Sequence, residues 1–207
     1  MEYTILRTKL NEISYDSKEW ERANVAKIST VNWDVTTYCP DTEVRVLTND
    51  EGLFVRFETD EENLRFNAEP IQGKVHLDSC VEFFFIPDPK NSKKYFNFEF
   101  NAKGAIHLGY GDGRSPLRTP CEITDVSIFK IDSFIKGEKG FILKFFIPYS
   151  YILKYADSIG DYFLGNFYKC REEGEKPHFV SFSPIGTLQP DFHRPEYFDK
   201  IYIELDK

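Results

Sequence analysis

The sequence has 207 residues, enough for one well-filled hydrophobic core or two small ones. A formal net charge of −8 argues against nucleic acids and anionic membranes as partners, because both require a basic surface. The 20 Phe and 12 Tyr residues favour an all-β fold, since aromatic side chains suit half-buried pleated surfaces. No apolar run in the sequence is long enough for a transmembrane helix.

The chain carries no internal repeat, low-complexity segment or Ser/Pro linker, which predicts a single domain over residues 1–207. Its N-terminus lacks a basic segment followed by an apolar core, so no signal peptide is expected. We therefore expect a cytoplasmic protein, or an extracellular one if the sequence is that of a mature chain. The cysteines, at positions 39, 80, 121 and 170, form no CxxC pair, which disfavours a zinc ribbon and favours buried free thiols.

The first expected element is a short helix with Asp16 as its N-cap, Glu19 reaching back to the cap, and Trp20 and Ala23 facing inward. A β-hairpin is predicted over 43–59, because two β-rich runs flank a polar turn. Further strands are predicted at 80–86, 95–101, 104–113, 125–131, 140–148, 162–170, 178–185 and 200–205. A short helix is expected at 149–156, behind Pro148. This set predicts an all-β protein, a β-sandwich of two antiparallel sheets of jelly-roll or immunoglobulin-like architecture, with short helices.

The segment YFNFEFN, residues 95–101, alternates strictly between two kinds of side chain. Phe96, Phe98 and Phe100 occupy one face, as expected for a strand with one buried side. The other face carries an aromatic ring, two amides and a carboxylate, from Tyr95, Asn97, Glu99 and Asn101. A polar face of this kind requires an explanation of its own.

A symmetric hairpin between 80–86 and 95–101 places Glu82 opposite Glu99, with Cβ atoms about 5 Å apart. Three interpretations of this pair remain open. Arg45 and Arg56 could neutralise both carboxylates from the neighbouring hairpin. The pair could be the acid and nucleophile of a retaining glycosidase. The face could instead be a binding platform on which amides and carboxylates bond sugar hydroxyls while aromatic rings stack on sugar faces.

Four segments in chain order resemble the family 9 carbohydrate-binding modules and their stand-alone relatives: DSCVEFFF (78–85), YFNFEFNAKG (95–104), GNFYKC (165–170) and FHRPEYF (192–198). The resemblance extends from about residue 14 to residue 205. It implies a β-sandwich related to the DOMON superfamily and a role in carbohydrate catabolism. It also implies non-catalytic binding of a glycan chain end or small sugar in a slot between two aromatic rings.

The resemblance assigns the sugar-contacting glutamate to Glu82 and the polar alternating strand to Asn97, Glu99 and Asn101. Typical members have Gln and Arg at the first two positions of that strand, so Glu99 differs in charge. The two rings of the slot correspond to Phe192, where Trp is usual, and to the position of His76, where a large ring is usual.

Two further candidates come from the late segments of the chain. Arg194 could clamp a hydroxyl or a carboxylate, with a surface ion pair to Glu196 or Asp199 as the alternative. Tyr168 could form an aromatic floor, with ordinary packing as the alternative.

No phosphate-binding glycine loop, GxSxG motif or metal-binding histidine spacing occurs in the sequence, so no cofactor is predicted. Family members often carry structural calcium, and Asp50-Glu51 or 60–62 could supply its oxygen ligands, unless these segments are solvated turns. The expected partner is a carbohydrate, and a glycoside hydrolase could work beside the module. The alternatives are a glycoside hydrolase using Glu82 and Glu99, or an interaction module with a degenerate sugar site.

Overall fold

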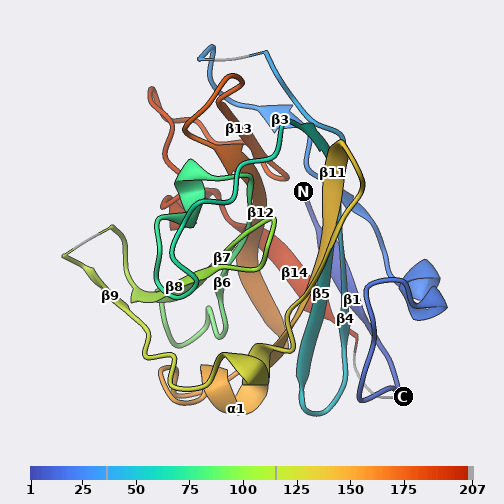
Figure 1. The fold of residues 1–207 in the computed structure, drawn as a ribbon. Helices are drawn as coiled ribbons and strands as arrows, with labels where there is room; N and C mark the ends of the chain where they lie inside the picture. The colour runs from blue at the N-terminus through green and yellow to red at the C-terminus, as the bar shows by residue number, and fades with distance from the viewer. Residues whose placement is uncertain (36, 115, 205–207) are drawn as a thin grey trace.

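The computed structural model describes residues 1–35, 37–114 and 116–204. In it, strand β1 (Tyr3–Arg7) joins the two sheets of the protein. Its first half pairs with β14 (Asp199–Ile203) in one sheet and its last two residues pair with β4 (Thr42–Thr48) in the other. The two sheets pack face to face as a β-sandwich (Figure 1), which confirms the predicted architecture. Both pairings of β1 are parallel, so the predicted antiparallel arrangement fails at this strand.

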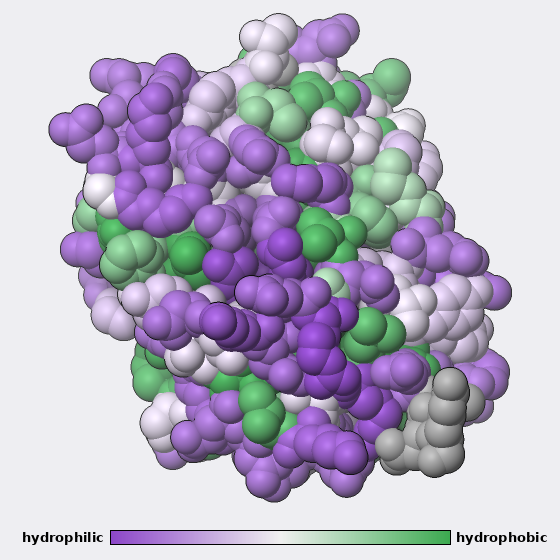
Figure 2. All heavy atoms as spheres, turned by 90° about the vertical axis from the view of Figure 1, so that its right-hand side faces the viewer, coloured by the Kyte–Doolittle hydropathy of each residue, from purple (hydrophilic) through white to green (hydrophobic). Residues whose placement is uncertain are grey.

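One sheet, which we call the β5 sheet, contains the predicted 43–59 hairpin. Its strands run in the order β10 (Asp132–Ile135), β11 (Lys139–Pro148), β5 (Gly52–Glu62), β4 and β1, with β2 (Ala26–Lys27) on β4. Its outer face is largely hydrophilic (Figure 2). There Arg45 pairs with Glu43, and Arg56 pairs with Glu58. The proposal that Arg45 and Arg56 neutralise Glu82 and Glu99 is therefore wrong, because these arginines have their ion-pair partners on their own sheet.

The other sheet, which we call the β7 sheet, carries the polar strand. Its main order is β14, β12 (Tyr162–Arg171), β6 (Cys80–Ile86), β7 (Tyr95–Asn101), β8 (Ile106–Gly111) and β9 (Arg118–Pro120). Strand β13 (His178–Ser181) pairs with the end of β12 and with β3 (Thr30–Val31). The predicted strands 80–86 and 95–101 have these bounds in the structure.

The core between the sheets contains the apolar face of β7. Phe96, Phe98 and Phe100 are fully buried there, and the Phe100 ring stacks on Phe145 of β11 at a centroid distance of 4.2 Å. The opposite face of β7 contributes Tyr95 to a second, smaller cluster. The period-two pattern in the sequence therefore predicted correctly which side chains enter the core.

The helices are short, and two local predictions about them are wrong. The first turn, Lys18–Arg22, is a 3-10 helix capped by Ser17 and not by Asp16, although Trp20 and Ala23 are buried as expected. The segment 125–131 is not a strand. It forms a 3-10 turn, Val126–Phe129, because the Asp125 carboxylate accepts a hydrogen bond from the Ser127 N–H at 2.9 Å.

The remaining helical segments are α1 (Tyr149–Ile152), which follows Pro148 as predicted, and the 3-10 turns Val75–Leu77 and Pro195–Tyr197. Among the described residues, no helix has both the length and the apolar character needed to cross a membrane.

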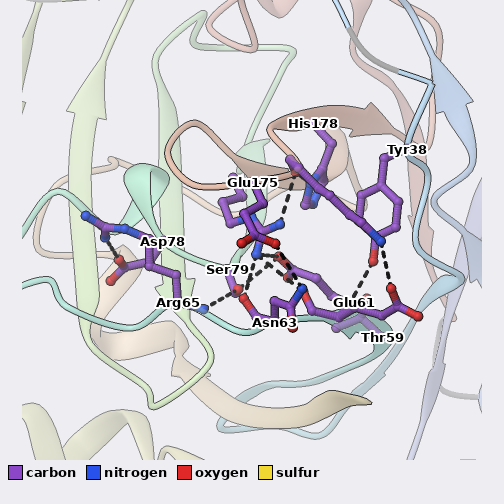
Figure 3. Close-up of polar contacts among 12 residues, drawn as sticks. Tyr38, Thr59, Glu61, Asn63, Arg65, Asp78, Ser79, Glu175 and His178 are labelled. Atoms are coloured by element: carbon purple, nitrogen blue, oxygen red, sulfur yellow. Dashed lines mark hydrogen bonds and ion pairs between the residues drawn. The ribbon is translucent and has the colours of Figure 1, made fainter. Parts of the chain in front are cut away.

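One end of the interior contains a buried ion cluster built on Glu61 of β5 (Figure 3). The Glu61 carboxylate lies 2.6 Å from Lys169 Nζ and 3.2 Å from Arg171 Nη1, and it accepts a hydrogen bond from Ser79 Oγ at 2.9 Å. All three charged side chains are almost completely buried. Glu61, one of the carboxylates considered as a calcium ligand, is thus held by two cations of the protein itself.

Three other acidic side chains considered for calcium also form ion pairs. Asp60 pairs with Lys136, and Glu62 pairs with Lys176 at 2.7 Å. Asp50 pairs with Arg7.

Candidate functional site

A row of side chains crosses the outer face of the β7 sheet. In the pairing of β12, β6, β7 and β8, Tyr168 lies opposite Glu82, Glu82 opposite Glu99, and Glu99 opposite His107. The predicted register of Glu82 and Glu99 is therefore correct. Because opposed side chains on antiparallel strands share one face, two carboxylates and an imidazole project from neighbouring strands in the same direction.

This row borders a cavity of about 420 Å³. Four of the predicted site residues line it together: His76, Glu82, Glu99 and Phe192. The other lining residues are His107, Arg114, Arg118, Cys170, Glu172, Phe179, Pro190, Asp191 and His193. The four remaining predicted residues, Asn97, Asn101, Tyr168 and Arg194, do not line the cavity.

The two carboxylates on the cavity floor have no cationic partner in the part of the chain that the structure describes. Glu82 is 3% exposed and Glu99 is 4% exposed, and no ion pair joins either of them to a Lys, Arg or His of the described residues. Glu99 accepts one hydrogen bond, from Asn97 Nδ2 at 2.7 Å. Burial raises the pKa of the Glu82 carboxyl well above its usual range, and the nearby Cys170 and Glu99 raise it further. These groups are acceptors or, when protonated, donors for a polar ligand.

Phe192 forms the aromatic wall of the cavity, and Tyr168 supports it from behind. The two rings stack at a centroid distance of 4.1 Å and an interplanar angle of 9°. Tyr168 Oη also donates a hydrogen bond to the Phe192 carbonyl at 3.2 Å. Tyr168 is fully buried, so it positions Phe192 and does not face the cavity as a floor.

A neutral histidine and a guanidinium form another part of the wall. His193 Nδ1 accepts a hydrogen bond from Arg118 Nη1 at 2.9 Å and lies 2.8 Å from Tyr95 Oη. Burial, together with the charges of Arg118 and Arg114, lowers the pKa of His193 to about 2. No acidic side chain among the described residues pairs with Arg118, whereas Arg114 pairs with Asp191 at 2.9 Å. Arg118 can therefore donate to a ligand in the cavity.

The predicted residues outside the cavity have partners within the protein. Asn101 Nδ2 donates to Asp78 at 2.9 Å, and Asn101 Oδ1 accepts the backbone N–H groups of Lys103 and Ala105, each at 3.0 Å. Asn101 thus holds the turn between β7 and β8. Arg194, whose side chain is 41% exposed, pairs with Glu196 at 2.6 Å, which is one of the partners considered from the sequence.

Several lining residues were not found from the sequence, and His107, Arg118 and Phe179 are among them. A signal for His107 existed, because the short connection after residue 101 fixes the register of the next strand and brings His107 opposite Glu99. Arg118 lies on the three-residue strand β9, which has no sequence pattern, and it reaches the cavity only through the pairing of β9 with β8.

The sequence profile of carbohydrate-binding family 9 matches residues 15–203 of the chain. In structure, the chain is similar to a putative carbohydrate-binding protein from Bacteroides uniformis ATCC 8492, with a TM-score of 0.85 and 25% identity over 98% of this chain and 99% of that one.

Two further similar structures are of a family 9 carbohydrate-binding module from Caldicellulosiruptor kristjanssonii. Its complex with cellotriose has a TM-score of 0.69 and 10% identity over 100% of this chain and 95% of that one. Its complex with glucose has a TM-score of 0.66 and 10% identity over 100% and 97% of the two chains. At this identity the likeness concerns the fold. No curated protein matches the sequence.

Proposed function

Because the chain belongs to carbohydrate-binding family 9, a family of non-catalytic sugar-binding modules, we propose that it binds a small sugar or the end of a glycan in the cavity beside Phe192. The observation that carries this proposal is that Glu82 and Glu99, which have no ion-pair partner among the described residues, line one cavity together with the Phe192 ring. Ligand pockets of small molecules typically combine an apolar wall with a few convergent polar groups in this way.

Each group has a distinct role in the proposed site. Phe192 stacks on an apolar sugar face, and Glu82 and Glu99 accept hydrogen bonds from sugar hydroxyls. Arg118, His76 and His107 bond hydroxyls from the other sides of the cavity. Asn97, Asn101 and Tyr168 act indirectly, since Asn97 orients Glu99, Asn101 holds the β7–β8 turn and Tyr168 supports Phe192.

Isothermal titration calorimetry with glucose and cellotriose tests the proposal. These probes are chosen because a structurally similar module is complexed with both. We expect a dissociation constant in the micromolar-to-millimolar range, roughly −4 to −8 kcal/mol, as befits a small polar ligand. A wider panel of monosaccharides and disaccharides follows, and a folded protein that gives no heat with any of them contradicts the proposal.

Variants locate the binding site in the cavity. Phe192→Ala should weaken binding at least about tenfold, or about 1.4 kcal/mol, because it removes the stacking surface. Glu99→Gln tests the carboxylate on the cavity floor. It changes the structure less than Phe192→Ala does, because glutamine has nearly the same shape as glutamate. Arg194→Ala is the matched control, because Arg194 follows Phe192 by two residues but lies outside the cavity lining. This variant should bind sugar like the original protein.

A second candidate function is glycoside hydrolysis, and the raised pKa of Glu82 opposite Glu99 is the observation that favours it. A retaining mechanism would use Glu82 as the acid and Glu99 as the nucleophile. A panel of chromogenic glycosides separates the two functions. We expect no turnover; turnover that disappears in Glu82→Gln would establish the hydrolase instead.

A further inference from the structure

Beneath one edge of the proposed sugar cavity, two thiols and a carboxylate converge. Cys80 of β6 and Cys170 of β12 lie directly opposite each other, and both project to the same face as Glu82. Glu82 Oε1 lies 3.7 Å from Cys80 Sγ and 3.2 Å from Cys170 Sγ. Each of the three residues offers a ligand atom within 4.8 Å of the other two, and all three are buried.

These separations match the spacing of ligands around one metal ion. In a tetrahedral zinc site, with Zn–S near 2.3 Å and Zn–O near 2.1 Å, a sulfur and an oxygen ligand lie about 3.6 Å apart and two sulfurs about 3.8 Å apart. The observed sulfur–oxygen distances of 3.2 and 3.7 Å lie close to this value.

The charge of the surroundings also suits a cation, since Lys169, the cation that acts on both thiols, is already paired with Glu61. Glu82 is a buried carboxylate whose hydrogen-bond partners are the two thiols, and the Glu99 carboxylate lies opposite it across the strand pair. A buried carboxylate without a cation is unfavourable, and a bound metal would remove that penalty. Glu82 and Cys170 border the cavity, so an ion has a path to the site.

We propose that Cys80, Cys170 and Glu82 bind a thiophilic divalent cation of the Zn²⁺ class. Two thiolates select such an ion over Ca²⁺ and Mg²⁺, which prefer oxygen ligands. Binding releases the thiol protons to solvent. The three protein ligands leave one tetrahedral position for water or for a group in the cavity. The site differs in place and in chemistry from the acidic segments considered for calcium.

Cobalt spectroscopy tests this site directly, because Co²⁺ substitutes for Zn²⁺ and absorbs when thiolates bind it. The reduced, metal-free protein should take up one equivalent of Co²⁺ per chain with a thiolate-to-cobalt charge-transfer band, and Zn²⁺ should abolish the band. Zn²⁺ should also raise the Tm of the full chain. A reduced protein that shows no charge-transfer band overturns the proposal without any variant.

Variants assign the ligands. Cys80→Ser and Cys170→Ser should each remove most of the band, and Glu82→Gln should weaken Co²⁺ binding at least about tenfold. Cys121→Ser is the matched control, because Cys121 is also a buried free thiol but lies in the main core, away from the cluster. A band that persists in Cys170→Ser, or that disappears in Cys121→Ser, contradicts the assignment. EDTA removes bound metal, so sugar titrations in its presence measure sugar binding alone. The proposed metal site and the proposed sugar site are thereby tested separately.

Discussion

Two of the regions that bury carboxylates differ in whether a cation of the protein neutralises them. Glu61 lies between Lys169 and Arg171 in the interior, whereas Glu82 and Glu99 lie on the cavity floor with no cationic partner among the described residues. Strand β12 contributes to both regions, because Lys169 and Arg171 project from one of its faces and Tyr168 and Cys170 from the other. In the interior, two cations of the protein neutralise Glu61. At the cavity, Glu82 and Glu99 remain available to a ligand.

The difference has an energetic meaning. Removing one partner from a buried ion cluster leaves an unpaired charge in a medium of low polarity, which strongly destabilises the folded state. Removing a carboxylate that has no cationic partner leaves no charge behind. The two regions should therefore respond very differently to the same chemical change, from glutamate to glutamine.

Glu61→Gln should have the largest effect. It leaves Lys169 and Arg171 buried beside a neutral amide, and we expect a loss of about 3–5 kcal/mol in the free energy of unfolding. Urea denaturation measures this loss. Ser79→Ala, which removes only one hydrogen bond to Glu61, is the control and should cost about 1 kcal/mol. A loss of less than 1 kcal/mol in Glu61→Gln would mean that the cluster is not held by charge.

Acid should destabilise both regions through one neutral histidine in each. Burial and nearby cations lower the pKa of His178, beside Lys169 and Arg171, and of His193, beside Arg118, to about 2. Since the unfolded pKa is near 6.5, the unfolded chain binds more protons below that pH. The stabilisation is complete above about pH 6.5 and is lost as the pH falls toward about 2, by about 1.4 kcal/mol per pH unit for each histidine.

Two measurements check this pH dependence. The slope of the unfolding free energy against pH should be positive between pH 5 and 6.5, and replacing His178 with Gln should reduce it. The NMR signals of the His178 and His193 rings should not titrate in this range. Titration of either signal near pH 6.5 would show that the ring is not held neutral.

Glu82→Gln should have the smallest effect on stability. In metal-free protein we expect a change within about 1 kcal/mol, neutral or stabilising, because glutamine replaces a carboxyl whose charged form is disfavoured by burial, and no cation loses its partner. Urea denaturation in EDTA, alongside Glu61→Gln, makes the comparison direct. If Glu82→Gln costs as much as Glu61→Gln, the carboxylate has a cationic partner in solution and the contrast between the two regions fails.

Local sequence patterns determined most of the fold. The alternation in YFNFEFN predicted the strand and its buried face. The hairpin register of Glu82 and Glu99 was predictable because both strands are short and the loop between them is symmetric. The prediction of a strand at 125–131 was wrong, although the apolar residues of this segment are typical of a strand. The Asp125 carboxylate accepts a hydrogen bond from the Ser127 N–H, and the chain forms a turn there.

The chain by itself thus specified most of its strands, their inward faces and the two opposed glutamates, since these depend on residues close in sequence. Only the tertiary structure decided that Arg118 and His193 meet at the cavity, that Tyr168 supports Phe192, and that Asn101 bonds Asp78. It also decided which carboxylates are neutralised and brought Cys80 against Cys170. These contacts join segments far apart in the chain, and their partners are set by sheet order and loop path, which no local period encodes.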